Sequence, residues 1–189
     1  MSTRPEFLAA VLTNPVNAAI LERGGELGQP AWYLAAGAVF QTVWNHLDGR
    51  DPGAGINDYD FFYFDTDLSY EAEDAVIASA RDLFADLGVD VEVRNQARVH
   101  LWYEKKFGKP GVQFSSCENA IDHFASPVCS YGVRREPDGA FSVYAPFGYA
   151  DLFDRVVRPN TALATREVFE AKAARWAREW PGVSVVGWP

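Results

Sequence analysis

Two aspartates separated by one residue, Asp58 and Asp60, stand at the entry to the aromatic run Phe61-Phe62-Tyr63-Phe64. Side chains of a β-strand alternate between its two faces, so both carboxylates are expected to point the same way, with Phe62 and Phe64 following on that face. Like charges this close repel each other and raise each other's proton affinity unless a cation lies between them. The spacing therefore predicts a cation at this end of a buried strand.

A second pair of acids follows one helix later, in the alternating segment VDVEVRN at residues 89–95. The valines share one face of this expected strand, and Asp90 and Glu92 share the other. If the two strands are neighbours, Asp58, Asp60 and either Asp90 or Glu92 come within reach of one metal ion. Carboxylate oxygens are the ligands of Mg²⁺ and Mn²⁺, which clamp phosphate oxygens. The alternative, that Asp58 and Asp60 only begin a solvated strand, stays open.

Helical segments are expected on both sides of the acid-bearing strand. Residues 5–24 predict one or two helices, and a helix of residues 70–87 ends naturally at Gly88. Gly37 directly precedes another helix, at a point where a backbone without a side chain could approach a ligand. The glycine, the paired acids and the third acid thus follow one another in a helix, strand, helix, strand order.

The second half of the chain is less regular. Short helices are expected around residues 100–108, 116–125 and 148–157, and Pro-Asp-Gly at 137–139 predicts a β-hairpin. A final helix at residues 165–180 carries an apolar stripe that favours packing over a cofactor site, formed by Phe169, Ala173, Trp176 and Trp180. These elements predict an α+β fold with a mixed sheet flanked by helices, a hairpin and a C-terminal helix.

The composition narrows the classes of partner. The 189 residues carry a formal net charge of −9, and the one compact basic patch is Lys105, Lys106 and Lys109. An extended nucleic-acid surface is therefore not expected, because it needs a basic stripe. Two cysteines, no leader-like apolar run and no apolar stretch long enough for a membrane span favour a cytoplasmic protein without a membrane partner.

Longer segments resemble a known family. LAAGAV, DYDFFYFD, VDVEVRNQARVHLWYEKKFG, APFGYADLFDRVVRPN and EAKAARWAREWP are together similar to a bacterial nucleotidyltransferase-like family of the DNA polymerase-β superfamily. The resemblance implies one domain over residues 1–189, with a catalytic core at about 30–105 and accessory helices and the hairpin at 106–189. It also implies transfer of a nucleoside monophosphate from a nucleoside triphosphate to an acceptor hydroxyl, with the acceptor unknown.

The resemblance assigns roles to particular residues. Gly37 takes the place of the glycine in the phosphate-binding turn, and Asp58 and Asp60 that of the metal-binding pair. Glu92, with Asp90 as the alternative, takes the place of the third acid, which would accept a proton from the acceptor hydroxyl. The cofactor implied is Mg²⁺ or Mn²⁺.

The chain departs from the superfamily pattern around the phosphate site. Ala38 follows Gly37 where a second glycine or a serine is usual, and Gln41 lies near the position of an arginine in related tRNA-processing enzymes. Loss of that arginine removes a charge-assisted phosphate contact. Arg98 and His100, which share a face if their strand continues, are further candidates for a phosphate contact.

Two other functions fit parts of the sequence. A nucleotidyltransferase fold with a decayed site would serve as a binding or regulatory module, which the Ala38 departure favours and the three acids oppose. The stretch FFYFDTDLS is also similar to the nucleophile strand of haloacid-dehalogenase-type phosphatases, with Asp65 as nucleophile and Asp67 as acid. In the nucleotidyltransferase interpretation, Asp65 and Asp67 instead close the strand and start the next helix.

Overall fold

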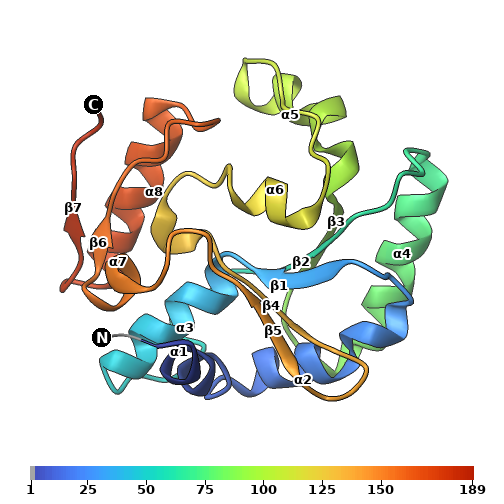
Figure 1. Ribbon diagram of the computed structural model, residues 1–189, viewed down its shortest axis with the longest axis horizontal. Helices are drawn as coiled ribbons and strands as arrows, with labels where there is room; N and C mark the ends of the chain where they lie inside the picture. Colours follow the sequence, from blue (N-terminus) through green and yellow to red (C-terminus); the bar gives the residue numbers. More distant parts are fainter. Residues whose placement is uncertain (1–2) are drawn as a thin grey trace.

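A five-stranded mixed sheet forms the centre of the computed structural model, which describes residues 3–189 (Figure 1). The spatial order of its strands is β3-β2-β1-β4-β5. In chain order these strands are β1 (Trp32–Ala35), β2 (Tyr59–Tyr63), β3 (Val91–Asn95), β4 (Gly132–Arg135) and β5 (Phe141–Tyr144). The fold class expected from the sequence is confirmed.

The strand directions explain how the chain assembles the sheet. β1 pairs antiparallel with β2, and β2 pairs parallel with β3 through the helical crossover that a parallel pair requires. The hairpin expected at Pro-Asp-Gly is present as β4 and β5, and β4 pairs antiparallel with β1. The hairpin is thus part of the central sheet and not an accessory to it.

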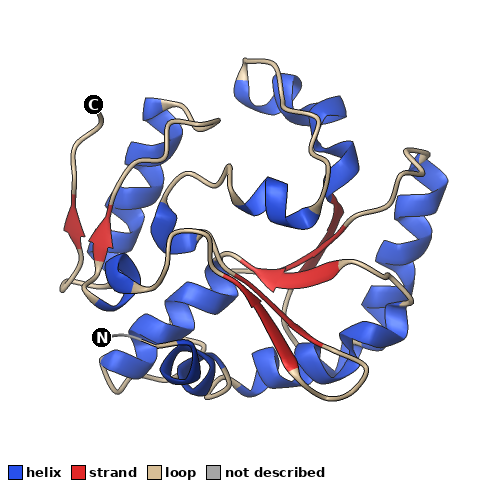
Figure 2. Ribbon diagram, viewed as in Figure 1, coloured by secondary structure: helices blue, strands red, loops and turns tan. Residues whose placement is uncertain are grey.

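Helices surround the sheet, as the colouring of Figure 2 shows. The α-helices are α1 (Arg4–Val11), α2 (Pro15–Arg23), α3 (Gly37–Leu47), α4 (Tyr70–Leu83), α5 (Val99–Phe107), α6 (Cys117–Ile121), α7 (Ala150–Phe153) and α8 (Arg166–Glu179). Short 3₁₀ turns lie at Gly24–Leu27, Ala85–Leu87, Gln96–Arg98 and Pro127–Cys129. β6 (Val156–Val157) and β7 (Ser184–Val185) form a separate parallel pair. Within residues 3–189, no helix is long and apolar enough to cross a membrane.

The two faces of β2 have different environments. Tyr59, Phe61 and Tyr63 are buried in the main core, which the sheet shares with α1, α2, α3 and α4. Asp60 and Phe62 alternate with them and point to the other face, as the strand period predicts. In Figure 1, α5, α6 and α8 stand around that second face. The alternation therefore places the acid on the face that the later helices enclose.

β3 ends at Asn95, the last residue of the segment 89–95 that was expected to form the strand. A 3₁₀ turn and α5 follow, so Arg98 and His100 do not lie on a continuing strand, which was the condition for their sharing a face. The side chain of Asn95 causes the break, because its Oδ1 accepts a hydrogen bond from the backbone N–H of Ala97 at 3.0 Å. An asparagine in this role caps a helical turn and ends the strand.

The last long helix docks through its aromatic stripe, as expected. Phe169, Trp176 and Trp180 are buried, and Trp180 donates from Nε1 to Oδ1 of Asn45 at 2.8 Å. Trp176 also packs edge-on against Phe40 of α3, with ring centroids 5.1 Å apart. These contacts fix α8 against α3, and they leave the side of α8 next to this stripe facing the second face of the sheet.

Candidate active site

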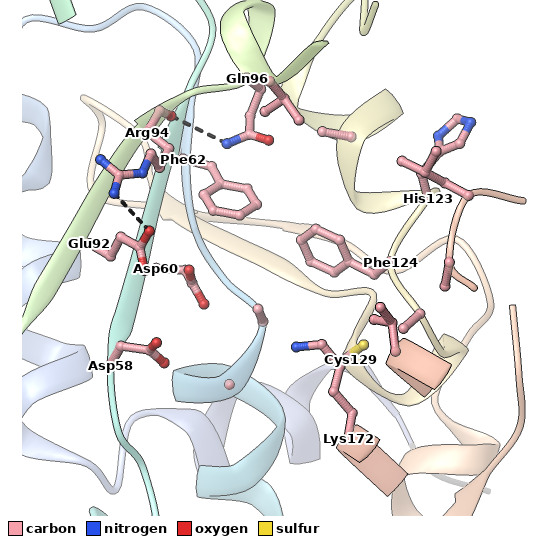
Figure 3. A pocket seen from close by; sticks show the side chains of 18 of the residues that line it. Asp58, Asp60, Phe62, Glu92, Arg94, Gln96, His123, Phe124, Cys129 and Lys172 are labelled. Carbon is pink, nitrogen blue, oxygen red and sulfur yellow. Dashed lines mark hydrogen bonds and ion pairs between the residues drawn. The ribbon is translucent and has the colours of Figure 1, made fainter. Parts of the chain in front are cut away.

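The three predicted acids line one cavity of about 830 Å³ (Figure 3). Asp58 directly precedes β2, Asp60 lies within it, and Glu92 is the register partner of Asp60 on the parallel strand β3. The volume falls within the range of about 300–1,000 Å³ that is usual for small-molecule sites. The strand pairing thus brings together the side chains of Asp60 and Glu92, which are 32 residues apart in sequence.

Glu92, and not Asp90, shares this cavity. Asp90 is exposed just before β3, and it lines a different hollow, on the side of the sheet near Asn14. Its backbone carbonyl accepts the first bond of the β2–β3 pairing, from the N–H of Tyr59 at 2.9 Å. The geometry therefore favours Glu92 as the third acid.

Asp60 is the electrostatic centre of the cavity. Its pKa is raised from 3.8 to about 7, chiefly by burial and in addition by the neighbouring carboxylates of Asp58 and Glu92. Lys172 and Arg94 act in the opposite direction. A carboxylate that is half protonated near neutral pH lacks a sufficient counter-charge. The site therefore favours binding of an additional cation.

Glu92 already has a cationic partner. Its Oε1 lies 3.0 Å from a guanidinium nitrogen of Arg94, two residues later on the same face of β3. Both side chains remain partly open to solvent, at 34% exposure for Glu92 and 40% for Arg94. Ion pairs with this degree of exposure are weak. Glu92 can accordingly exchange Arg94 for another partner at little cost.

The start of α3 lies beside the acids. A methyl group built on Gly37 would lie 3.1 Å from Nε2 of Gln41 and 3.9 Å from Oδ1 of Asp58, so the bare backbone borders both residues. The strained backbone of this turn falls one residue earlier, on Ala36, with φ of 52°. Such a φ favours glycine. The positive φ of the turn thus falls on Ala36, while Gly37 provides the close approach expected from the sequence.

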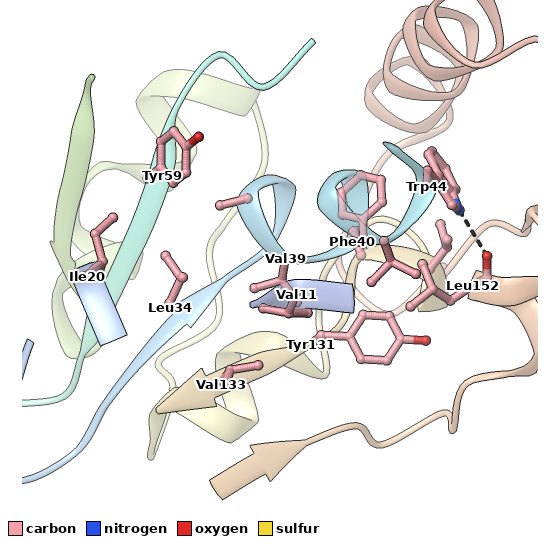
Figure 4. Packing of buried hydrophobic residues seen from close by; sticks show 14 of the residues in the cluster. Val11, Ile20, Leu34, Val39, Phe40, Trp44, Tyr59, Tyr131, Val133 and Leu152 are labelled. Carbon is pink, nitrogen blue, oxygen red and sulfur yellow. Dashed lines mark hydrogen bonds between the residues drawn. The ribbon is translucent and has the colours of Figure 1, made fainter. Parts of the chain in front are cut away.

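The helix behind Gly37 is held rigidly. Val39, Phe40 and Trp44 are buried in the main core, and Trp44 donates from Nε1 to the carbonyl oxygen of Leu152 at 2.9 Å (Figure 4). The N-terminus of α3 opens on the cavity, because Ala36 and Gly37 line it. The first N–H groups of a helix lack partners within the helix and carry partial positive charge, which suits an anion.

Ala38 and Gln41 occupy different environments. Ala38 is fully buried in the core and does not line the cavity, so its side chain makes no ligand contact. Gln41 does line the cavity, and its Oε1 is buried without a hydrogen-bond partner. An unpaired buried acceptor is costly and is usually satisfied by water or a ligand. Gln41 is therefore the polar group of α3 that is oriented for binding.

Arg98 and His100 lie away from the cavity lining. Arg98 forms an ion pair with Glu73 of α4 at 2.8 Å and donates to the carbonyl oxygen of Ser69 at 3.0 Å. His100 lies on α5 with its Nδ1 buried and unpaired. The structure therefore gives Arg98 a structural role, tying the 3₁₀ turn after β3 to α4, and places neither Arg98 nor His100 in the cavity with the acids.

Two cations that the sequence did not single out do line the cavity. Lys172 and Arg175 stand one helical turn apart on α8, on the side facing the acids. Arg175 donates to the carbonyl oxygen of Gly55 at 2.7 Å, whereas Lys172 forms no ion pair within residues 3–189. In the sequence, Lys172 and Arg175 are distinguished only by being next to Ala173 and Trp176 of the apolar stripe of α8. That position does not predict which strand the two cations face.

Cys129, Asp65 and Asp67 are not arranged to act as nucleophiles in this cavity. Cys129 lines the cavity next to Lys172, but burial raises the pKa of its thiol to about 11, so it is protonated at neutral pH. Asp65 and Asp67, the phosphatase candidates, lie outside the cavity lining and accept hydrogen bonds from the backbone N–H groups of Asp67 and Ser69, both at 2.9 Å. Both aspartates therefore shape the turn before α4.

Asp58 and Asp60 have the donor chemistry that Mg²⁺ requires, with two hard oxygen ligands, one of them deprived of counter-charge. Across the described part of the chain, however, no three His, Cys, Asp or Glu side chains are arranged closely enough to hold a metal ion by themselves. Mg²⁺ commonly uses one or two carboxylates and completes its shell with water and substrate phosphates. The residues present fit a metal ion that binds together with a nucleotide.

A family model described as nucleotidyltransferase matches residues 23–185 of the chain. The chain belongs to this nucleotidyltransferase family. The resemblance inferred from the sequence motifs is thereby confirmed, and nucleotidyl transfer is the activity of the family to which this protein belongs. No curated protein matches the sequence.

Three solved structures are similar to this nucleotidyltransferase-family protein to different degrees. One, described as revealing a CCA-adding enzyme head domain, is similar over 98% of this chain and 97% of its own, with a TM-score of 0.78 and 24% identity. Two tRNA-processing enzyme structures align less well, with TM-scores of 0.42 and 0.43 at 17% and 16% identity. They cover 74% and 85% of this chain, and 35% and 41% of their own. The first similarity shows a shared fold.

Proposed function

We propose that this protein transfers a nucleoside monophosphate from a nucleoside triphosphate to a hydroxyl group, with Mg²⁺ or Mn²⁺ as cofactor. The observation that carries the proposal is the convergence of Asp58, Asp60 and Glu92 on one cavity beside the bare backbone of Gly37. The family membership supports the reaction class. The raised pKa of Asp60 supports the need for a cation.

Asp58 and Asp60 would hold the metal ion, since both carboxylates face the cavity. When bound, the ion would neutralise the carboxylates and the phosphate oxygens that they face. The N-terminus of α3, the amide of Gln41 and the cations Lys172 and Arg175 would bind the triphosphate. Lys172 and Arg175 thus replace Arg98 and His100 as the phosphate-binding side chains, because they lie in the cavity.

The transfer needs one bond made and one broken at the α-phosphorus. The acceptor oxygen bonds to phosphorus, the bond from phosphorus to the pyrophosphate oxygen breaks, and pyrophosphate leaves on the opposite side. Glu92 would accept the proton of the acceptor hydroxyl after releasing Arg94, its partner at 3.0 Å. Lys172 and Arg175 would stabilise the charge that gathers on pyrophosphate.

A catalytically decayed binding module is the second candidate, favoured by Ala36 and Ala38 on either side of Gly37. Thermal unfolding with Mg²⁺ or Mn²⁺, with and without each common nucleoside triphosphate, tests binding. We expect metal plus triphosphate to raise the Tm of the wild-type protein but not that of the Asp58→Asn, Asp60→Asn double variant. A measurement of pyrophosphate release then distinguishes the two candidates, because an active transferase releases pyrophosphate and a binding module does not. No response to any of the four triphosphates would contradict the proposed function.

A further inference from the structure

The cavity continues beyond the acids into an aromatic half. Six aromatic side chains of β2, α5 and the segments after α5 and α6 line it, and they are Phe62, Trp102, Tyr103, Phe107, Phe114 and Phe124. Phe62 lies two residues beyond Asp60 on the same face of β2, so this half begins about 7 Å from the acids. Phe62 and Phe124 meet edge-to-face, with ring centroids 5.6 Å apart. Such a wall of rings suits a flat apolar group.

The groups suited to a triphosphate lie on the other side of the acids. In Figure 3, Lys172 and the start of α3 lie on one side of Asp60, while Phe62 and Gln96 lie on the opposite side. An in-line transfer requires the acceptor hydroxyl and the departing pyrophosphate to lie on opposite sides of the α-phosphorus. If pyrophosphate points toward Lys172 and α3, the acceptor approaches from the side of Phe62 and Glu92.

We propose that the aromatic half of the cavity binds the acceptor, and that the acceptor is a small molecule bearing a hydroxyl group next to a planar apolar group. This inference rests on the proposed nucleotidyl transfer. The net charge of −9 and the enclosing rings disfavour an RNA end, which would bring further phosphates toward three carboxylates. A flat apolar group instead gains from leaving water for this lining.

Two polar side chains at the edge of the aromatic half orient the acceptor. Nδ1 of His123 lies 2.7 Å from the carbonyl oxygen of Asn119, so this nitrogen donates, and in that tautomer Nε2 is the acceptor. Gln96 donates from Nε2 to the carbonyl oxygen of Arg94 at 3.3 Å, which fixes the direction of its amide. Both residues line the cavity and offer acceptor atoms to a polar substituent on the planar group.

Saturation-transfer and chemical-shift NMR test this inference with a defined probe, 2-phenylethanol, in the presence of Mg²⁺ and a non-hydrolysable triphosphate. Butane-1,4-diol serves as the comparison that has hydroxyls but no ring. We expect 2-phenylethanol to bind and the diol not to bind. Phe124→Ala should weaken binding of 2-phenylethanol at least about tenfold, because an apolar wall is lost. Phe147→Ala, which removes an aromatic ring that is 49% exposed and outside the cavity, should leave binding unchanged.

The double variant Asp58→Asn, Asp60→Asn separates this inference from the proposed function. It should still bind 2-phenylethanol while losing the response to metal plus triphosphate. If the wild-type protein responds to metal plus triphosphate but does not bind 2-phenylethanol, the inference is wrong and the proposed function stands. The inference is also wrong if Phe124→Ala binds 2-phenylethanol as tightly as the wild-type protein does. If the alanine variant unfolds, Phe124→Leu takes its place in this comparison. Displacement of 2-phenylethanol by a C-C-A trinucleotide would overturn it too, because an RNA end would then occupy the aromatic half.

Discussion

Asp60 on β2 and Glu92 on β3 are register partners of a parallel strand pair, and both face the same cavity. Neighbouring strands lie about 4.8 Å apart, so the two carboxylates are close enough to disfavour each other's ionisation. Asp58 adds a third carboxylate from the entry to β2. Against these, only the partly exposed Arg94 and Lys172 lower the pKa of Asp60. The excess of negative charge raises the pKa of Asp60 and favours binding of a cation.

The stability of the metal-free protein should fall as the pH rises from about 4 to 7. Asp60 has a pKa of about 7 in the folded chain against 3.8 ordinarily, so the folded state keeps its proton where the unfolded state has lost it. The contribution to the free energy of unfolding is therefore fully present below about pH 4 and lost by about pH 7. Asp60→Asn should remove this slope and raise stability at pH 8 by on the order of 2 kcal/mol, allowing for water in the cavity.

Urea unfolding at several pH values with a chelator present measures this slope. Asp82→Asn, which removes an exposed carboxylate of α4, is the matched control and should keep the wild-type slope. A slope that is the same in the Asp60→Asn variant and in the wild type would show that Asp60 ionises in the ordinary way.

Glu92→Gln should abolish most of the transfer activity while leaving nucleotide binding nearly intact. The variant keeps the shape of the side chain but cannot accept a proton, and loss of a general base typically costs about 100-fold or more in rate. The neighbouring Asp90→Asn, on the other side of the sheet, should remain within about twofold of wild type. Pyrophosphate release gives the rate for both variants, and a reversed order of effects would assign the third acid to Asp90.

Lys172→Met should weaken binding of the triphosphate by about tenfold, since a charge-assisted hydrogen bond to phosphate contributes about 1.5–3 kcal/mol. Arg178→Met removes an exposed cation from the same helix, outside the cavity, and provides the control. Calorimetric titration with a non-hydrolysable triphosphate and Mg²⁺ compares the two. Equal affinities would remove Lys172 from the phosphate site.

Ala36→Gly should stabilise the protein, because Ala36 precedes α3 in a backbone conformation that favours glycine. Ala36 has φ of 52°, a conformation that costs a residue with a Cβ about 1–2 kcal/mol, and glycine loses about 0.5–1 kcal/mol in chain entropy. We expect a net rise in Tm of about 2 °C. Ala38→Gly, two residues later in the fully buried part of α3, should instead lower the Tm. A lower Tm for Ala36→Gly would mean that the turn is not strained.

Local patterns predicted the acid pair and the sheet well, because the alternation of β2 and β3 depends on neighbouring residues alone. Arg98 and His100 do not line the cavity, because Asn95 ends β3 and caps a 3₁₀ turn, a signal that the run Asn-Gln-Ala-Arg carries. Lys172 could not have been predicted in the same way. Its position depends on tertiary packing, chiefly the docking of Trp176 and Trp180 against α3, which no periodicity in α8 specifies.

Binding of Mn²⁺, followed by electron paramagnetic resonance with and without a non-hydrolysable triphosphate, tests the shared metal site most directly. For the wild-type protein we expect binding that tightens when the triphosphate is present, and that weakens below about pH 7 as Asp60 takes up a proton. The Asp58→Asn, Asp60→Asn variant should lose this binding, while Asp82→Asn should keep it. Mn²⁺ binding that is equally strong in the double variant would contradict a metal site at Asp58 and Asp60.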